Sequence, residues 1–103
     1  MGLLVVDNQK PGVELDDRLL AHLKVVVFAK FRRHESFGFS WDHASASGGR
    51  TSIWFHESIP VKFVFFGGSA PDLNRAWIDE LMIAANGASG LQLTKEPPEH
   101  QGP

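Results

Sequence analysis

The sequence predicts an α+β domain with a single antiparallel sheet and elements in the order ββαβββαβ. Three aromatic-rich runs between residues 35 and 66 alternate with period two, as the side chains of a strand do. Two other segments, residues 17–33 and 75–86, repeat apolar residues at helical spacing. We therefore expect a central three-stranded meander with both helices packed on one of its faces. The alternative places one helix on each face.

Two short strands and a helix open the chain. Residues 3–6 and 12–15 are apolar runs around a polar segment in which Pro11-Gly12 favours a turn. Asp16 is a typical N-cap residue for the helix that follows. The last turn of this helix is basic, which is the charge that a helix C-terminus prefers.

The three alternating runs supply the central strands. Their inward side chains are predicted to be Phe37, Phe39 and Trp41, then Thr51, Ile53 and Phe55, then Val61, Phe63 and Phe65. A slip of one residue would turn every side chain to the other face. The loop between the first two strands must therefore hold an odd number of residues. We expect the helices on this aromatic face because it offers the larger apolar area.

A break rich in Gly and Pro separates the meander from the second helix. The apolar stripe of that helix includes Trp77, which we expect to anchor the core. Residues 91–94 are predicted to be a final strand. Residues 1–96 should thus form one domain, and residues 97–103 a flexible C-terminal tail, because the tail is polar and rich in Pro.

Size and composition exclude several classes of protein. A chain of 103 residues is long enough for one core, and its net charge of -2 favours no class of partner. The absence of cysteine excludes disulfides, thiolate metal sites and cysteine nucleophiles, and suits a reducing compartment. The sequence shows neither a basic, signal-like start nor an apolar run long enough to cross a bilayer. We predict a cytoplasmic protein without a membrane partner.

Motifs for catalysis, cofactors and metals are missing from the sequence. It lacks a Gly-rich phosphate loop, a Gly-x-Ser-x-Gly elbow and histidine pairs at metal spacing on a helix. His43 beside Asp42 and His56 beside Glu57 come nearest to a metal site. The expected register places these pairs several residues apart along the sheet, so solvated histidines are favoured. We therefore expect no catalytic residue, no metal and no cofactor.

The outer face of the meander is the candidate binding surface. The neighbours expected across the strands are Ser40 and Val64 for Trp54, and Gly38 and Lys62 for His56. An aromatic ring, an imidazole and a lysine on a platform of small residues suit base stacking with phosphate contact. The predicted nucleic-acid-binding residues are Trp54, His56, Lys62, Arg50, Arg32 and Arg33, with the arginines extending a phosphate track. Alternatively, the second helix, the final strand or another subunit covers this face.

Several strings of the sequence resemble one family of small bacterial proteins. They include Asp16-Asp17-Arg18, Leu20-Ala21-His22-Leu23, Arg33-His34-Glu35-Ser36-Phe37, Gly49-Arg50-Thr51-Ser52-Ile53-Trp54 and Asn74-Arg75-Ala76-Trp77-Ile78. Many members of this family carry the label "ATP-dependent DNA ligase". The resemblance spans residues 13–97. It implies an uncharacterised family associated with DNA ligases.

The residues of this chain do not support ligase activity. A DNA ligase needs a nucleophilic lysine in a Lys-x-Asp-Gly setting to form its adenylate. No lysine of this chain stands in that setting. The chain is also too short to hold both an ATP pocket and a DNA clamp. We therefore predict that the protein is not itself a ligase.

Three functions from different classes follow from these observations. The resemblance favours a non-catalytic accessory module that binds nucleic acid or a DNA-processing protein. The alternative is a protein-interaction module, or a homodimer, that buries the face around Trp54. A small-molecule enzyme or sensor is the third, and isolated histidines are its only support.

Overall fold

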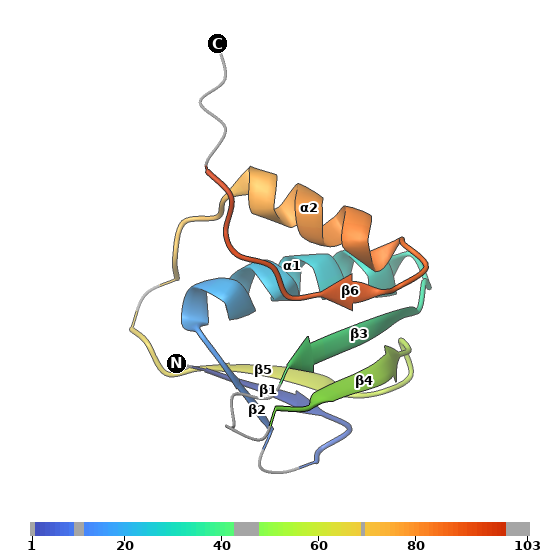
Figure 1. Cartoon of the computed structure of the whole chain (residues 1–103). Coiled ribbons are helices and arrows are strands. Elements are labelled where there is room, and N and C mark those ends of the chain that lie inside the picture. Colours follow the sequence, from blue (N-terminus) through green and yellow to red (C-terminus); the bar gives the residue numbers. More distant parts are fainter. Residues whose placement is uncertain (1, 10–11, 43–47, 69, 99–103) are drawn as a thin grey trace.

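The computed structural model describes residues 2–9, 12–42, 48–68 and 70–98. The chain forms two helices and two three-stranded sheets, so the predicted α+β class is confirmed. In chain order the elements are β1 (Gly2–Val6), β2 (Val13–Leu15), α1 (Asp17–Arg32), β3 (Phe37–Asp42), β4 (Arg50–Phe55), β5 (Val61–Phe65), α2 (Arg75–Ala85) and β6 (Leu91–Gln92). Figure 1 shows the helices at the top and β6 and then β3 below them, with β4 and the sheet of β1, β2 and β5 lower still.

Both helices form where their caps and apolar spacing predict. The Asp16 carboxylate accepts hydrogen bonds from two backbone N–H groups in the first turn of α1, at 3.1 and 3.3 Å. The Asn74 side chain accepts one from the first turn of α2 at 3.0 Å. Each cap satisfies N–H groups that have no partner within the helix. Trp77 is only 4% exposed, which confirms that it belongs to the core.

The prediction of a single antiparallel sheet is wrong. Strand β5 leaves the meander and pairs with β1, while β6 joins β3 in a parallel pair. Alternation predicts which side of a strand is buried, but it does not specify the neighbouring strand. Strand β1 offers β5 an apolar partner, because the fully buried Leu4 pairs with Phe63. The Asp7 N–H also donates to the carbonyl of Pro60 at 2.7 Å, so this ladder begins before β5.

The pairing of β3 with β4 confirms the shared apolar face but corrects the register. Phe37 lies opposite Phe55, and Gly38 lies opposite Trp54 rather than opposite His56. The shift covers two residues, which leaves every side chain on its predicted face, and so the alternation does not detect it. The observed register brings the rings of Phe37 and Phe55 to 5.4 Å, edge to face. It also places the large indole opposite a residue without a side chain.

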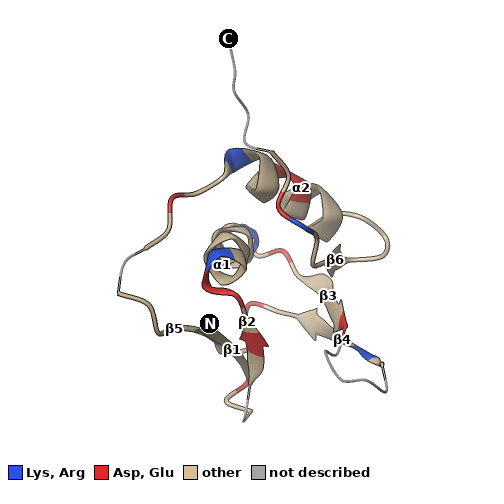
Figure 2. Ribbon diagram, turned by 60° about the vertical axis from the view of Figure 1, so that its left-hand side comes forward, with Lys and Arg blue, Asp and Glu red and all other residues tan. Residues whose placement is uncertain are grey.

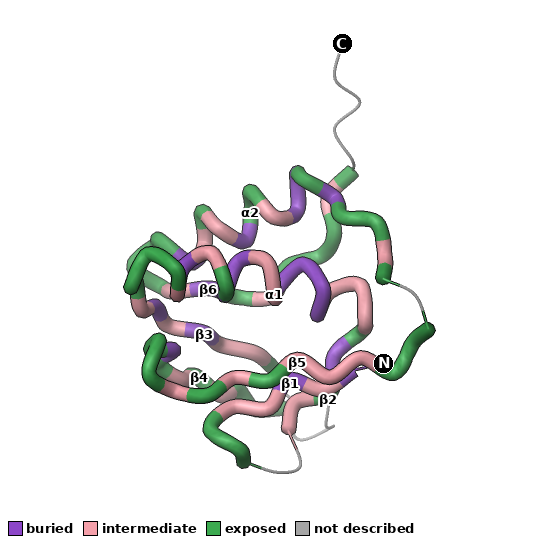
Figure 3. The backbone as a smooth tube through the Cα atoms, turned by 180° about the vertical axis from the view of Figure 1, so that it is seen from behind, coloured by how far each residue is buried: buried purple, intermediate pink, exposed green. Residues whose placement is uncertain are grey.

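Helix α1 lies at the centre of the core. It packs against β1, β5 and α2, and α2 packs in turn against β3 and β6. The ring of Phe31 on α1 lies 6.2 Å from Phe37 and 6.3 Å from Phe55. Figure 3 shows buried residues along α1 and exposed ones along the outer side of α2 and parts of β4. The inward face of β3 and β4 is therefore covered, and their outward side chains are exposed or half-buried.

Candidate functional site

Trp54 lies at the centre of an open sheet surface. Its side chain is 62% exposed, which is a high fraction for a large apolar residue. We call its surroundings the Trp54 face, which consists of the outward residues of β3 and β4: Gly38, Ser40, Asp42, Arg50, Ser52 and Trp54. The indole is therefore accessible to a ligand in this fold.

Two glycines form the floor beside the indole. Gly38 of β3 lies opposite Trp54 of β4. On the other side of Gly38, where β6 pairs with β3, the backbone of Gly90 comes close to it, just before β6. A Cβ atom on Gly90 would lie 2.8 Å from the carbonyl oxygen of Gly38, which is closer than contact allows, and the φ of Gly90 is +77°. Only glycine fits this position without strain. The two glycines thus line the pocket without placing a side chain in it.

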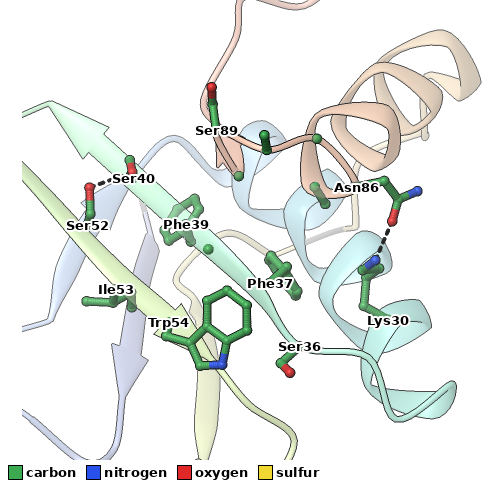
Figure 4. A pocket seen from close by; sticks show the side chains of 15 residues that line it. Lys30, Ser36, Phe37, Phe39, Ser40, Ser52, Ile53, Trp54, Asn86 and Ser89 are labelled. Atoms are coloured by element: carbon green, nitrogen blue, oxygen red, sulfur yellow. Dashed lines mark hydrogen bonds between the residues drawn. The ribbon is translucent and has the colours of Figure 1, made fainter.

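A pocket of about 590 Å³ lies over this floor (Figure 4). Most of its polar groups are hydroxyls, contributed by Ser36, Ser40, Ser52 and Ser89. The hydroxyls of Ser40 and Ser52 lie 2.7 Å apart and form a hydrogen bond across the two strands. The pocket can therefore accept a planar or apolar group against the indole and hydrogen-bond its edges.

Lys30 is the cation that lines this pocket, and it was not among the predicted site residues. It lies on α1 with its side chain only 5% exposed, and its Nζ is 2.9 Å from Oε1 of Glu35. The same ammonium donates a hydrogen bond to the Asn86 side chain at the end of α2. The hydrogen bond from Lys30 lowers the pKa of the Glu35 carboxyl below its usual value. Two of the three donors of Lys30 are therefore used within the protein.

The sequence contained a signal for Lys30. It falls seven residues after Leu23 and four after Val26, on the apolar stripe of α1. It also belongs to the basic last turn of the helix, so its position alone does not distinguish it from the exposed Arg32. Its pairing with Glu35 explains why the pocket wall is neutral overall.

The structure separates His56 and Lys62, which were predicted to lie next to each other. His56 follows the end of β4, and its Nδ1 lies 2.8 Å from the Ser58 hydroxyl. Lys62 belongs to β5 and pairs with Val5 of β1, in the other sheet. The prediction that they flank Trp54 together is wrong because β5 does not pair with β4.

The three predicted arginines are also dispersed, with Arg50 in β4 and with Arg32 and Arg33 at the end of α1. Figure 2 shows the Lys and Arg positions spread over several elements. Arg50 shares the Trp54 face, at the opposite end of β4, and pairs with Asp42 of β3. Arg32 lies in the last turn of α1, where its Nε is 3.5 Å from the carbonyl of Phe28. Arg33 lines a separate groove of about 620 Å³ between the helices, together with Arg75. Among the described residues, Arg50 is thus the cation that remains on the predicted surface.

A second cleft borders the other side of Trp54. It measures about 400 Å³, and its lining is mostly apolar: Leu4, Val6, Val13, Trp41, Ile53, Trp54 and Ile59. These residues come from both sheets, so the cleft lies between the sheets, next to β4. Because β4 is one of the two edge strands of its sheet, a polar pocket and an apolar cleft meet at one strand edge.

Metal and membrane features are not found in the described part of the chain. No group of three or more His, Cys, Asp or Glu residues could hold a metal ion there. Glu57, which stands beside His56 in the sequence, contacts His34 at 2.5 Å. His43 lies outside the described residues. None of the described helices is both long and apolar enough to span a bilayer.

Comparison with known proteins identifies the family of the chain. No curated protein and no solved structure matches it. A family model, described as a domain of unknown function, matches residues 1–96. This match fits the uncharacterised family expected from the sequence, and it shows no link to DNA ligases. The chain therefore belongs to the family of the domain of unknown function DUF7882.

Proposed function

We propose that the protein is a non-catalytic protein-interaction module that binds an extended polypeptide segment along the edge of β4. The position of Trp54 carries this proposal. The indole is exposed on an edge strand, between the polar pocket of the Trp54 face and the apolar cleft between the sheets. An exposed aromatic residue beside two pockets is typical of a protein-binding surface.

An added strand matches the chemistry of both sides of β4. A polypeptide that pairs with an edge strand gains main-chain hydrogen bonds, and its side chains point alternately to the two faces. On one face they meet Trp54 and the hydroxyls of Ser40 and Ser52. On the other they meet the apolar cleft beside Ile53. We therefore expect a ligand segment with apolar residues at every second position.

The charge distribution supports a protein partner over a nucleic acid. A phosphate backbone needs several cations along its track. Of the four predicted cations, Lys62, Arg32 and Arg33 lie away from the Trp54 face, and Arg50 shares this face with one carboxylate, that of Asp42. The lysine of the pocket, Lys30, is bonded to Glu35 and Asn86. A nearly neutral face suits a polypeptide better.

Selection from a library of random displayed peptides tests this function. Peptides should be enriched on the wild-type protein, quench its tryptophan fluorescence, and lose at least about ten-fold in affinity on Trp54→Ala, as expected for an aromatic anchor. Ile83→Ala is the matched control because Ile83 is 72% exposed on α2, away from both pockets. Equal binding to wild type and Trp54→Ala, or no enrichment at all, would contradict the proposal.

A further inference from the structure

We infer that the polypeptide bound at β4 is the β4 strand of a second copy of this chain, in a two-fold antiparallel dimer centred on Ser52. This inference rests on the proposed function and names its partner. The resulting sheet would run continuously through both protomers, with β4 next to β4 at its centre. Closed two-fold dimers of this kind are the commonest symmetric assemblies of soluble proteins.

Strand β4 lacks the usual protections of an edge strand. Its sequence, Arg50–Phe55, contains no proline, and Arg50 is its single charged residue. Natural edges commonly avoid pairing through proline, several charges, a bulge or very short length. Here the edge is six residues long and carries exposed Trp54 on one side. An edge of this composition is suited to pairing with another strand.

Complementarity selects the register of the dimer. Pairing around Ser52 places Arg50 of each protomer opposite Trp54 of the other, on the same face of the sheet. A guanidinium over an indole is a favourable cation–π pair, and the symmetry forms it twice. Arg50 lies across from Asp42 in the strand register, but within the part of the chain that the structure describes the two side chains form no ion pair, so the guanidinium is available for this contact.

The inward face agrees with the same register. Thr51 of each protomer lies opposite Ile53 of the other, and pairs of β-branched residues are favourable across antiparallel strands. Ile53 already lines the apolar cleft between the sheets. Centring the pair on Ile53 would instead set Arg50 opposite His56, and centring it on Trp54 would leave Arg50 without an aromatic partner. The register around Ser52 therefore satisfies both faces.

The dimer also changes the composition of the Trp54 face. In one protomer Arg50 lies four residues from Trp54 along β4, at the far end of the strand. In the dimer the second copy's arginine lies directly opposite Trp54, so each site is completed by the other copy. The pocket over Gly38 then gains a second cation, in addition to the Lys30 that each chain already supplies.

Sedimentation equilibrium tests the assembly, since the monomer mass is 11.4 kDa. We expect a concentration-dependent dimer of twice this mass. Arg50→Ala should weaken dimerisation about five- to thirty-fold, because two cation–π pairs are lost, and Trp54→Ala should weaken it at least as much. Arg32→Ala is the matched control on α1 and should leave the dimer unchanged. A wild-type protein that stays monomeric up to millimolar concentration would overturn the inference.

Thiol cross-linking tests the register, because the chain contains no cysteine of its own. Ser52→Cys places the two thiols opposite each other at the axis, and a short bismaleimide should join them within minutes. Glu80→Cys is an exposed control on α2, outside both pockets, and should not cross-link. A dimer in which the Ser52→Cys variant cross-links no faster than the Glu80→Cys variant would show another interface and overturn the inference. If the protein is monomeric but the displayed peptides bind, the proposed function stands and only the second-copy partner is rejected.

Discussion

At the residue scale, Trp77 and Trp54 show how one residue type takes opposite roles. Both were located correctly by periodicity: Trp77 on the apolar stripe of α2, and Trp54 on the outward side of a strand. Trp77 packs against the buried His22, with ring centroids 4.7 Å apart, and its Nε1 lies 3.3 Å from the Thr94 hydroxyl. Periodicity predicts which side of a helix or strand a residue occupies, and this was enough to place both tryptophans.

Trp77→Ala should therefore cost about 3–5 kcal/mol of unfolding free energy, as expected for truncating a buried aromatic residue. Urea unfolding followed by far-ultraviolet circular dichroism measures this loss. Ile83→Ala, on the exposed side of the same helix, should change the unfolding free energy by less than about 0.5 kcal/mol. A loss below about 1 kcal/mol for Trp77→Ala would mean that this indole does not support the core.

His22 stands beside the apolar stripe of α1 in the sequence, yet it is fully buried. Its Nε2 accepts a hydrogen bond from the backbone N–H of Asn74 at 2.7 Å, and its Nδ1 lies 2.6 Å from the carbonyl of Arg18. The imidazole thus joins α1 to the N-terminus of α2. Sequence spacing placed His22 beside the apolar stripe, and no local pattern indicated a partner 52 residues away.

His22→Leu keeps the approximate size but leaves the Asn74 N–H without its acceptor. We expect a loss of about 1–3 kcal/mol in unfolding free energy, the cost of a buried donor without a partner. Amide hydrogen exchange at Asn74 should accelerate in this variant. Unchanged exchange and stability would show that another group replaces the imidazole.

At the element scale, β5 shows what alternation leaves undetermined. The pattern of Val61–Phe65 predicted a strand and its inward side; the strand was found, and Val61, Phe63 and Phe65 are half-buried against the core. The choice between β4 and β1 as its neighbour depends on long-range packing, because both strands offer an apolar side. The site prediction failed at Lys62 for this reason, whereas Trp54 and Arg50, which depend only on β4, kept their predicted face.

Gly38 and Gly90, where β3 meets the segment before β6, allow a matched pair of substitutions. Gly90→Ala should destabilise the fold by more than about 1 kcal/mol, because it combines a positive φ with a Cβ 2.8 Å from the Gly38 carbonyl. Gly38→Ala should change the unfolding free energy little, because its Cβ would lie 3.8 Å from the nearest atom. Thermal unfolding of both variants measures the difference. Equal destabilisation would contradict the close approach.

The segment after β6 is held by a charged network, although its sequence predicted only the end of a domain and a tail. The Arg18 guanidinium contacts both oxygens of the Glu96 carboxylate at 2.6 and 2.7 Å. The Asn74 amide donates to Glu96 and to the Pro97 carbonyl, each at 2.9 Å. Residues 99–103 of the predicted tail lie outside the described residues.

The stability of this segment should depend on pH through Glu96. Hydrogen bonds from Arg18, and secondly from Asn74, lower the pKa of Glu96 to about 2 from its usual 4.5. A carboxyl group whose pKa is lower in the folded state stabilises the fold fully at a pH above its unfolded-state pKa. This stabilisation is lost as the pH falls toward its folded-state pKa. Wild type should therefore have a higher Tm than Glu96→Gln at pH 7, and this gap should close between about pH 4.5 and 2.

Glu80→Gln, an exposed substitution on α2, is the control for a general effect of removing one negative charge. Its Tm should follow that of wild type at each pH. If Glu96→Gln showed no gap at pH 7, the ion pair with Arg18 would not contribute to stability in solution.

At the scale of the whole molecule, the division into two sheets decides the electrostatics of the Trp54 face. The single sheet expected from the sequence would have brought Lys62 next to His56. The actual topology moves that lysine to the sheet of β1, β2 and β5, and the helix end carries Arg32 and Arg33 elsewhere. The nucleic-acid hypothesis depended on the gathering of these cations, which only the tertiary fold could decide.

Oligonucleotide titration therefore separates the two functions. We expect single-stranded oligonucleotides to leave the tryptophan fluorescence of the wild-type protein unchanged up to about 100 μM at low salt, because the Trp54 face of one chain carries one arginine beside one aspartate. Saturable quenching that disappears in Trp54→Ala but persists in Ile83→Ala would contradict this and restore the nucleic-acid hypothesis. The salt dependence would then identify the contacts, since each phosphate neutralised on a single strand adds about −0.7 to the slope of log K against log salt. A slope near that value would assign the contact to Arg50 alone, and a steeper one would require cations from a second copy or from the other sheet.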